Sequence, residues 1–264
     1  MTRFAIPLAV LRSEWIKLRT ARATYIALIA AFVFGLGAGL LDVLSVTDHW
    51  ATMSAADRAG FDPVGDPLSG FQLSELALGA LGVLAVSTEY ATGMIRSTLI
   101  ATPRRAVVYT AKALVLGLFA LLASELCAFA AFFLGQLVLR RQHLDVSVTT
   151  PHVLRAITFA GLYMAVVTMV GFGLGALIRH TAGAIAAMFA LVFLIYPAAR
   201  AFEGSSYLPD HLALANAASA LASIASPTGP HAQRIPSFAF ASFDLVLYLV
   251  VFLGLGAARA LRDA

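Results

Sequence analysis

Charged residues and cysteine are both scarce in this sequence of 264 residues. Only 12% of the residues are charged and 60% are hydrophobic, whereas an average soluble domain has about 25% charged residues. This balance excludes an intrinsically disordered chain. The single cysteine, Cys127, has no partner within the chain, which excludes a disulfide scaffold. A soluble globule leaves roughly a quarter to a third of its surface exposed and could not hide so many apolar side chains. We therefore expect a membrane protein.

Sequence patterns that support catalysis or metal binding are also missing. The six histidines are scattered without metal-ligand spacing, and no Gly-x-Ser-x-Gly sequence occurs. Neither of the two lysines, Lys17 and Lys112, follows a glycine, as the phosphate-binding loop of a P-loop ATPase requires. We expect the chain to be neither an enzyme nor a binder of metals or cofactors.

Instead of catalytic or metal-binding motifs, the sequence has long apolar runs. About 20 helical residues cross the hydrocarbon of a bilayer, and six runs approach or exceed that length. The six runs are Tyr25–Leu41, Phe71–Val86, Ala113–Leu139, Ile157–Ile178, Ala182–Ala199 and Phe238–Ala258. The fifth run is short before Pro197, and we expect it to continue to about Phe202. We predict an all-α, polytopic membrane protein in which residues 1–264 form one domain with six transmembrane helices.

The distribution of basic residues predicts how the chain is oriented. With the N-terminus in the cytoplasm, 12 of the 18 Lys and Arg residues lie on the inner side, as the positive-inside rule requires. We expect a plasma (inner) membrane protein with both termini cytoplasmic. The isoelectric point of about 9.5 then reflects attraction to inner-leaflet lipids, and no nucleic-acid partner is expected.

Two segments outside the runs have a helical pattern. In residues 4–20, Phe4, Leu8, Leu11, Trp15 and Leu18 recur at spacings of three and four, which predicts an amphipathic helix on the inner membrane surface. A frayed basic tail is the alternative. Residues 203–237 predict short helices on the outer side, either re-entrant or packed on the surface of the spans.

Residues 87–108 form the most informative segment, between the second and third runs on the inner side. They are too polar for the membrane and too patterned for a slack linker. Ile95 and Leu99 indicate a short helix that ends at Thr102–Pro103. Such an amphipathic element could enter a groove on a cytoplasmic partner, whereas the simpler interpretation is a structured turn.

Three stretches of the chain resemble the membrane subunits of ATP-driven exporters, the ABC-2-type transporter permeases. The opening stretch Arg12–Thr20 resembles the entry helix of that family. The central stretch Glu89-Tyr90-Ala91-Thr92-Gly93-Met94-Ile95-Arg96 resembles its Glu-x-x-x-Gly-Thr-Ile element, with Met94 in place of threonine, and Leu99–Arg105 continues it. Tyr207-Leu208-Pro209 is a weaker similarity.

The resemblance implies a permease that dimerises with a second copy or a related chain and binds separate ATP-binding cassette ATPase subunits. It also implies that residues 87–105 couple ATP-driven movement to the spans. Our candidate coupling residues are Glu89, Gly93, Ile95, Arg96 and Leu99. We expect Gly93 to permit a tight turn, and Glu89 and Arg96 to offer ionic contacts to the ATPase.

Three carboxylates fall inside the apolar runs, where a charge is costly. Glu125 lies nearest the middle of its run and marks either a polar point on a substrate path or a neutral acid bonded to Tyr163 or Thr168. Glu75 and Asp244 lie closer to the outer surface, and we expect them to touch water. The alternative function is a proton-coupled secondary transporter that uses Glu125. An intramembrane enzyme or scaffold is a third hypothesis, without a catalytic constellation to support it.

Two glycine runs also lie within the predicted spans. Gly35-x-Gly37-x-Gly39 and Gly171-x-Gly173-x-Gly175 superficially resemble nucleotide-binding loops. No strand precedes either of them, and small residues let membrane helices approach closely. We expect both runs to serve helix packing.

Overall fold

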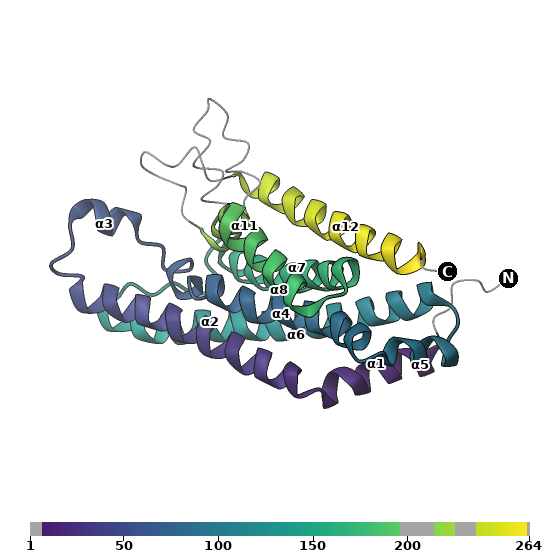
Figure 1. Ribbon diagram of the computed structural model, residues 1–264. Helices are drawn as coiled ribbons and strands as arrows, with labels where there is room; N and C mark the ends of the chain where they lie inside the picture. Colours follow the sequence, from purple (N-terminus) through teal and green to yellow (C-terminus); the bar gives the residue numbers. More distant parts are fainter. Residues whose placement is uncertain (1–6, 196–213, 225–235, 263–264) are drawn as a thin grey trace, which may run out of the picture.

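The chain folds as a bundle of helices. The computed structural model describes residues 7–195, 214–224 and 236–262, and every regular element in these ranges is helical. The long helices lie side by side, and the short helices α1 and α5 lie at the opposite end of the bundle from α3 (Figure 1). The predicted all-α class is confirmed for the described residues.

Five helices among the described residues are long and apolar enough to cross a membrane. They are α2 (Arg22–His49), α4 (Phe71–Ala91), α6 (Arg105–Leu139), α7 (Val153–Ile178) and α12 (Phe238–Arg262). Each contains one of the predicted runs. The first helix continues eight residues beyond the run that predicted it, because the less apolar stretch after Leu41 keeps the helical conformation to His49.

The remaining predicted run gives a shorter helix. α8 (Thr181–Phe189) is followed by a π-helical turn, η3 (Ala190–Leu194), and together they are too short to count as a span. The expected continuation to about Phe202 lies outside the described residues. The described part of the chain therefore has five candidate spans rather than six.

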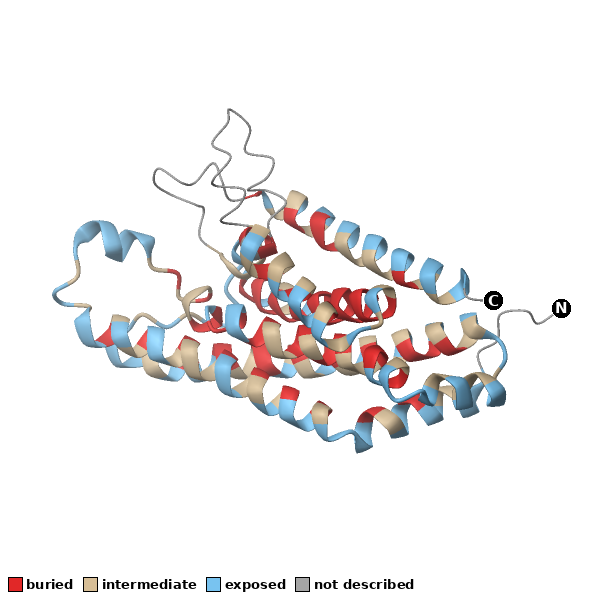
Figure 2. Cartoon of the chain, in the orientation of Figure 1, coloured by how far each residue is buried: buried red, intermediate tan, exposed pale blue. Residues whose placement is uncertain are grey.

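The centre of the bundle is α7. In its most apolar window 83% of the residues are buried, against 17% for α12 and 28% for α2. α7 packs against α4, α6 and α12, and Figure 2 shows buried residues along most of its length. A helix that is apolar on every side and also enclosed is a core helix.

The outward face of α6 has the opposite character. Leu114, Leu118, Leu122 and Leu126 follow one another at spacings of four and are 58–65% exposed. A soluble protein rarely leaves so large an apolar stripe uncovered. In the hydrocarbon of a membrane an exposed apolar stripe has no unfavourable contact with water, so the burial pattern agrees with a membrane location.

Glycines determine how closely the central helices approach. A Cβ atom on Gly171 would lie 2.2 Å from the carbonyl oxygen of Gly79 in α4, and one on Gly39 would lie 2.1 Å from that of Pro67. Gly37 has no atom within 4 Å of its Cβ position. The predicted packing role of the two glycine runs is confirmed, and Gly37 is the member that does not take part.

Short helices complete the described structure. α1 (Leu8–Thr20) and α5 (Met94–Ala101) lie at one end, whereas α3 (Ala55–Gly60), η1 (Asp66–Leu68) and η2 (Arg140–Gln142) belong to the loops of the other end. α11 (Leu214–Ala222) lies within the predicted outer segment 203–237 and packs against α7 and α12. Leu214, Ala217 and Leu221, which are spaced three and four residues apart, are buried on one face of α11.

Candidate functional site

The turn between α4 and α5 depends on a glycine. Gly93 follows the end of α4 with a φ of +72°, in the left-handed region that side chains rarely adopt. The chain can therefore change direction there and begin α5 at once. α5 ends just before Thr102 and Pro103, since a residue preceding proline disfavours helix. The predicted short helix within residues 87–108 and its break are both confirmed.

α5 presents one face to the bundle and another to its surroundings. Ile95 and Leu99 are half-buried, one turn apart, on the inward face. Arg96 is exposed, and Ile100 is 85% exposed. The helix thus offers both an apolar and a basic side chain to a partner at the end of the bundle.

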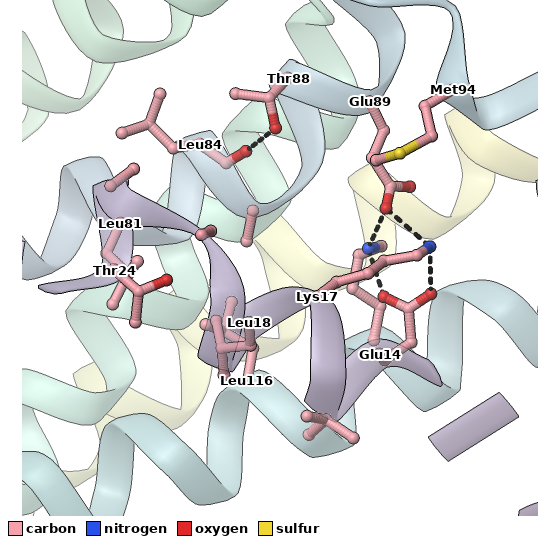
Figure 3. Close-up of a pocket in the computed structure, with 15 residues that line it drawn as sticks. Glu14, Lys17, Leu18, Thr24, Leu81, Leu84, Thr88, Glu89, Met94 and Leu116 are labelled. Carbon is pink, nitrogen blue, oxygen red and sulfur yellow. Dashed lines mark hydrogen bonds and ion pairs between the residues drawn. The ribbon is translucent and has the colours of Figure 1, made fainter. Parts of the chain in front are cut away.

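Four charged side chains meet where α1, α4 and α6 come together, and we call them the ionic cluster. Glu14 and Lys17 come from α1, Glu89 from α4 and Lys112 from α6. The Lys17 ammonium lies 2.8 Å from Glu14 and 2.9 Å from Glu89, and Figure 3 shows it between the two carboxylates. Lys112 binds Glu89 at 2.8 Å and also binds Glu14. Each lysine therefore bridges both acids.

Three of the four members of the ionic cluster are nearly closed to solvent. Glu14 and Glu89 are 4% and 3% exposed, and Lys112 is 8% exposed. Two positive and two negative charges alternate, so the net charge is zero and each charge has two opposite partners. Burial lowers the pKa of Lys17, but its hydrogen bonds to Glu14 and Glu89 and the attraction of their charges together raise it, and the net shift is upward. Lys17 consequently stays charged at neutral pH.

The ionic cluster fixes the entry helix to the segment that leads into α5. Glu89 lies two residues before the end of α4, and Lys112 lies two turns after the start of α6. α5 connects α4 to α6, so the ion pair between Glu89 and Lys112 holds together the two ends of the segment that contains α5. A movement of α5 that displaced either end would have to strain or break this ion pair.

Only one member of the ionic cluster was recognised from the sequence. Glu89 was a candidate coupling residue, whereas Glu14, Lys17 and Lys112 were not. One usable signal was present: Lys17 and Lys112 are the only lysines in the chain, and each lies close to the boundary of an apolar run. The structure turns Glu89 inward, so its charge is satisfied inside the chain, while Arg96 is exposed as a contact to a partner requires.

The predicted apolar stripe of the entry helix lies partly against the bundle and partly exposed. Leu18 is buried and Leu11 half-buried, whereas Leu8 is 83% and Trp15 42% exposed. Trp15 contacts Phe119 edge-on, with ring centroids 6.0 Å apart. The buried face also contains Glu14, because the ionic cluster attracts this polar side of α1 toward α4 and α6. The remaining residue of the predicted stripe, Phe4, lies outside the described residues.

Two intramembrane carboxylates are more deeply buried than expected. Glu75 is 2% exposed and accepts a hydrogen bond from the Tyr163 hydroxyl, and Asp244 has no exposed surface. The prediction that they touch water is wrong, because α4, α7 and α12 pack around them.

Glu125 differs from both of these residues. It is half-buried on α6 beside Gly161, and its Oε2 atom has no hydrogen-bond partner among the described residues. The expected partners are engaged elsewhere, since Tyr163 binds Glu75 and the Thr168 hydroxyl donates to the Met164 carbonyl oxygen at 2.9 Å. The prediction of a bond to Tyr163 or Thr168 is therefore wrong.

Comparison with known proteins identifies a family model that the chain matches. A family model described as "ABC-2 family transporter protein" matches residues 10–197. The match includes all but the first two residues of α1, the α5 segment and all four members of the ionic cluster. No curated protein matches the chain.

Among the described residues, no group of three or more His, Cys, Asp or Glu residues is arranged to hold a metal ion.

Proposed function

The chain belongs to the ABC-2 family of transporter proteins, and from this premise we propose that it is the permease subunit of an ATP-driven exporter. In this proposal the chain forms the substrate path, and a separate ATP-binding cassette subunit hydrolyses ATP. The family match does not favour the alternative of a proton-coupled carrier that uses Glu125.

We propose a six-pass topology with both ends of the chain in the cytoplasm. The sixth pass would begin with α8. Three observations support this orientation. The start of α1 and the end of α12 lie at the same end of the bundle (Figure 1). Arg96, Arg104 and Arg105 are also at that end. The loops of the opposite end contain Asp57, Asp62 and Asp66, with Arg58, Arg140 and Arg141 as the basic exceptions. We propose that the chain lies in the plasma (inner) membrane in this orientation.

α5 is the observation that carries the proposal. It is a separate eight-residue helix joined to α4 by a left-handed glycine, and it exposes Ile100 and Arg96. A helix that leaves a large apolar side chain at a bundle end is suited to enter a groove on a partner. Through the ionic cluster, its position is linked to α1, α4 and α6. Movement of the ATPase would thus reach the spans through α5.

A second permease copy or a related chain would complete the path. Substrate would pass between the two permeases as they alternate between inward- and outward-facing packings. Glu125, half-buried and with an unsatisfied oxygen, is our candidate for a polar point on that path. α1 would rest against the inner membrane surface with Leu8 and Trp15 toward lipid.

Replacing Ile100 with glutamate tests whether α5 is the docking helix. Burying an isoleucine stabilises an interface by roughly 1.5–3 kcal/mol, so we expect Ile100→Glu to reduce the ATPase subunit retained with the purified permease by about tenfold or more. Retention is measured by quantitative mass spectrometry of the gently solubilised complex, together with its rate of ATP hydrolysis.

Leu8→Glu is the matched control, because Leu8 is 83% exposed at the same end of the bundle. It should leave the ATPase subunit bound. Equal retention in the Ile100→Glu variant and the wild type would contradict the proposal, as would ATP hydrolysis by the permease alone.

Gly93 tests the geometry of the turn. Valine is strained at a φ of +72°, with a cost of roughly 1–2 kcal/mol for the left-handed conformation, and α5 would be redirected to relieve it. We expect Gly93→Val to insert normally but to lose most of the bound ATPase subunit. Gly93→Asn should retain more of it, since asparagine tolerates this conformation. Equal loss in both variants, or in neither, would show that the left-handed turn is not required.

A further inference from the structure

A pocket of about 480 Å³ lies on the far side of Glu89 and Lys112 from α1. It is enclosed by the end of α4, by α5, by the start of α6 and by the ends of α7 and α12. These are ends of candidate spans, so the pocket lies at the level where a membrane protein meets lipid head groups.

Three arginines give the pocket its charge. Arg96 lies on α5, Arg105 is the first residue of α6, and Arg179 directly follows the end of α7. The one carboxylate in the lining is Glu89, and its charge is already balanced by Lys17 and Lys112. The pocket consequently carries a positive charge that its own lining does not neutralise.

Two of these arginines have no ion-pair partner among the described residues. Neither Arg96 nor Arg105 forms an ion pair within the part of the chain that the structure describes. Arg179 is instead held in place: its guanidinium lies 4.7 Å from the centroid of the Tyr90 ring and donates a hydrogen bond of 2.9 Å to the Arg259 carbonyl oxygen. One oriented arginine and two adaptable ones can together surround an anion.

Apart from Glu89 and Lys112, most of the remaining lining is apolar. Ile95 and Leu99 are half-buried and accessible, whereas Val86, Val108, Phe172 and Ala176 are buried. A site for a free inorganic anion has no need of such a wall, because that ligand has no hydrocarbon to bury. A ligand with a phosphate and acyl chains fits both parts of the pocket, because the phosphate can contact the arginines and the acyl chains can contact the apolar residues. Basic pockets between transmembrane helices at the cytoplasmic side are suited to anionic lipid head groups.

We propose that this pocket binds the phosphate head group of an anionic phospholipid from the adjoining leaflet. Arg96, Arg105 and Arg179 contact the phosphate, and the start of the acyl chains lies against Ile95 and Leu99, which are only half-buried. Arg96 and Leu99 belong to α5, so the bound lipid would also steady that helix. The inference goes beyond the proposed function, because lipid binding requires no ATPase subunit.

The test uses the purified full chain in a neutral detergent. Phosphatidylglycerol and phosphatidylcholine are titrated separately, and bound lipid is counted by native mass spectrometry. We expect phosphatidylglycerol to bind about tenfold more tightly or better. Each arginine near an anionic lipid contributes about a fivefold factor in affinity, so Arg96→Gln should weaken binding about fivefold and the double variant with Arg105→Gln roughly 30-fold.

Arg104→Gln is the matched control, because Arg104 precedes Arg105 in sequence but is exposed and outside the pocket. It should change the affinity for phosphatidylglycerol by less than about twofold, since a solvent-exposed charge outside the pocket makes no direct contact with the phosphate and contributes little. Arg96→Gln alters an exposed side chain, so it should fold even if the double variant does not.

Several results would overturn the proposal. Equal weakening by Arg104→Gln and Arg105→Gln would reduce the effect to general surface charge. Competition by inorganic phosphate at the concentration of the lipid would identify a free-phosphate site. Stronger binding of an acidic peptide than of phosphatidylglycerol would assign the pocket to a protein partner.

Discussion

Replacing Gly82 with valine is expected to prevent α4 and α7 from packing. A Cβ atom at Gly82 would lie 1.9 Å from the Thr168 carbonyl oxygen and 2.8 Å from the Phe172 nitrogen. Both are backbone atoms of α7, so no side chain can move aside and the two helices must separate. Overpacking of a core costs about 1–3 kcal/mol and occasionally more, and a backbone clash in the central helix pair belongs at the upper end.

The effect of Gly82→Val is measured as loss of the monodisperse species in fluorescence-detected size exclusion and as a lower unfolding temperature in detergent. Gly37→Val is the control, because no atom lies within 4 Å of its Cβ position. We expect that variant to behave as the wild type. If Gly82→Val were equally well tolerated, α4 and α7 could not be as close as the structure has them.

The second large effect is expected for Lys112→Met. Removing this lysine leaves Glu14 and Glu89 buried together with only Lys17 to balance them. Breaking a buried ion pair by deleting one partner typically costs 3–5 kcal/mol, because the remaining charge has lost both water and its counter-ion. We expect a fall of about that size in the free energy of unfolding, measured by denaturant titration in mixed micelles.

Two comparisons make the prediction for Lys112 specific. Lys17→Met should cost less, because the Lys17 side chain is 27% exposed and that of Lys112 only 10%. Adding Glu14→Gln to Lys112→Met restores neutrality by leaving Lys17 with Glu89, so the double variant should be more stable than the sum of the single changes implies. Simple additivity would show that the four charges do not act as one cluster.

The helical segments were predictable because each depends on neighbouring residues. The apolar runs predicted all five long helices, and the short helix containing Ile95 and Leu99 followed from its spacing and from Pro103. The least secure run was the one interrupted by Pro197, and the structure describes only its first part, through α8 and η3.

The carboxylates show where prediction from the sequence was wrong. Glu75 and Asp244 were placed near water from their distance along a run, yet neighbouring helices cover both. Depth in the membrane can be read from the sequence, but the direction of a side chain around its helix depends on what packs opposite. For the same reason Tyr163, the expected partner of Glu125, binds Glu75 instead.

The sequence by itself determined that this chain crosses a membrane several times and has a structured segment between its second and third apolar runs. Hydropathy and turn chemistry are properties of adjacent residues, so no tertiary contact was needed to find them. Only the tertiary structure decided which charges meet. Glu14 and Lys112 are 98 residues apart in the chain, and a charge can stay buried only where folding brings its opposite within hydrogen-bonding distance.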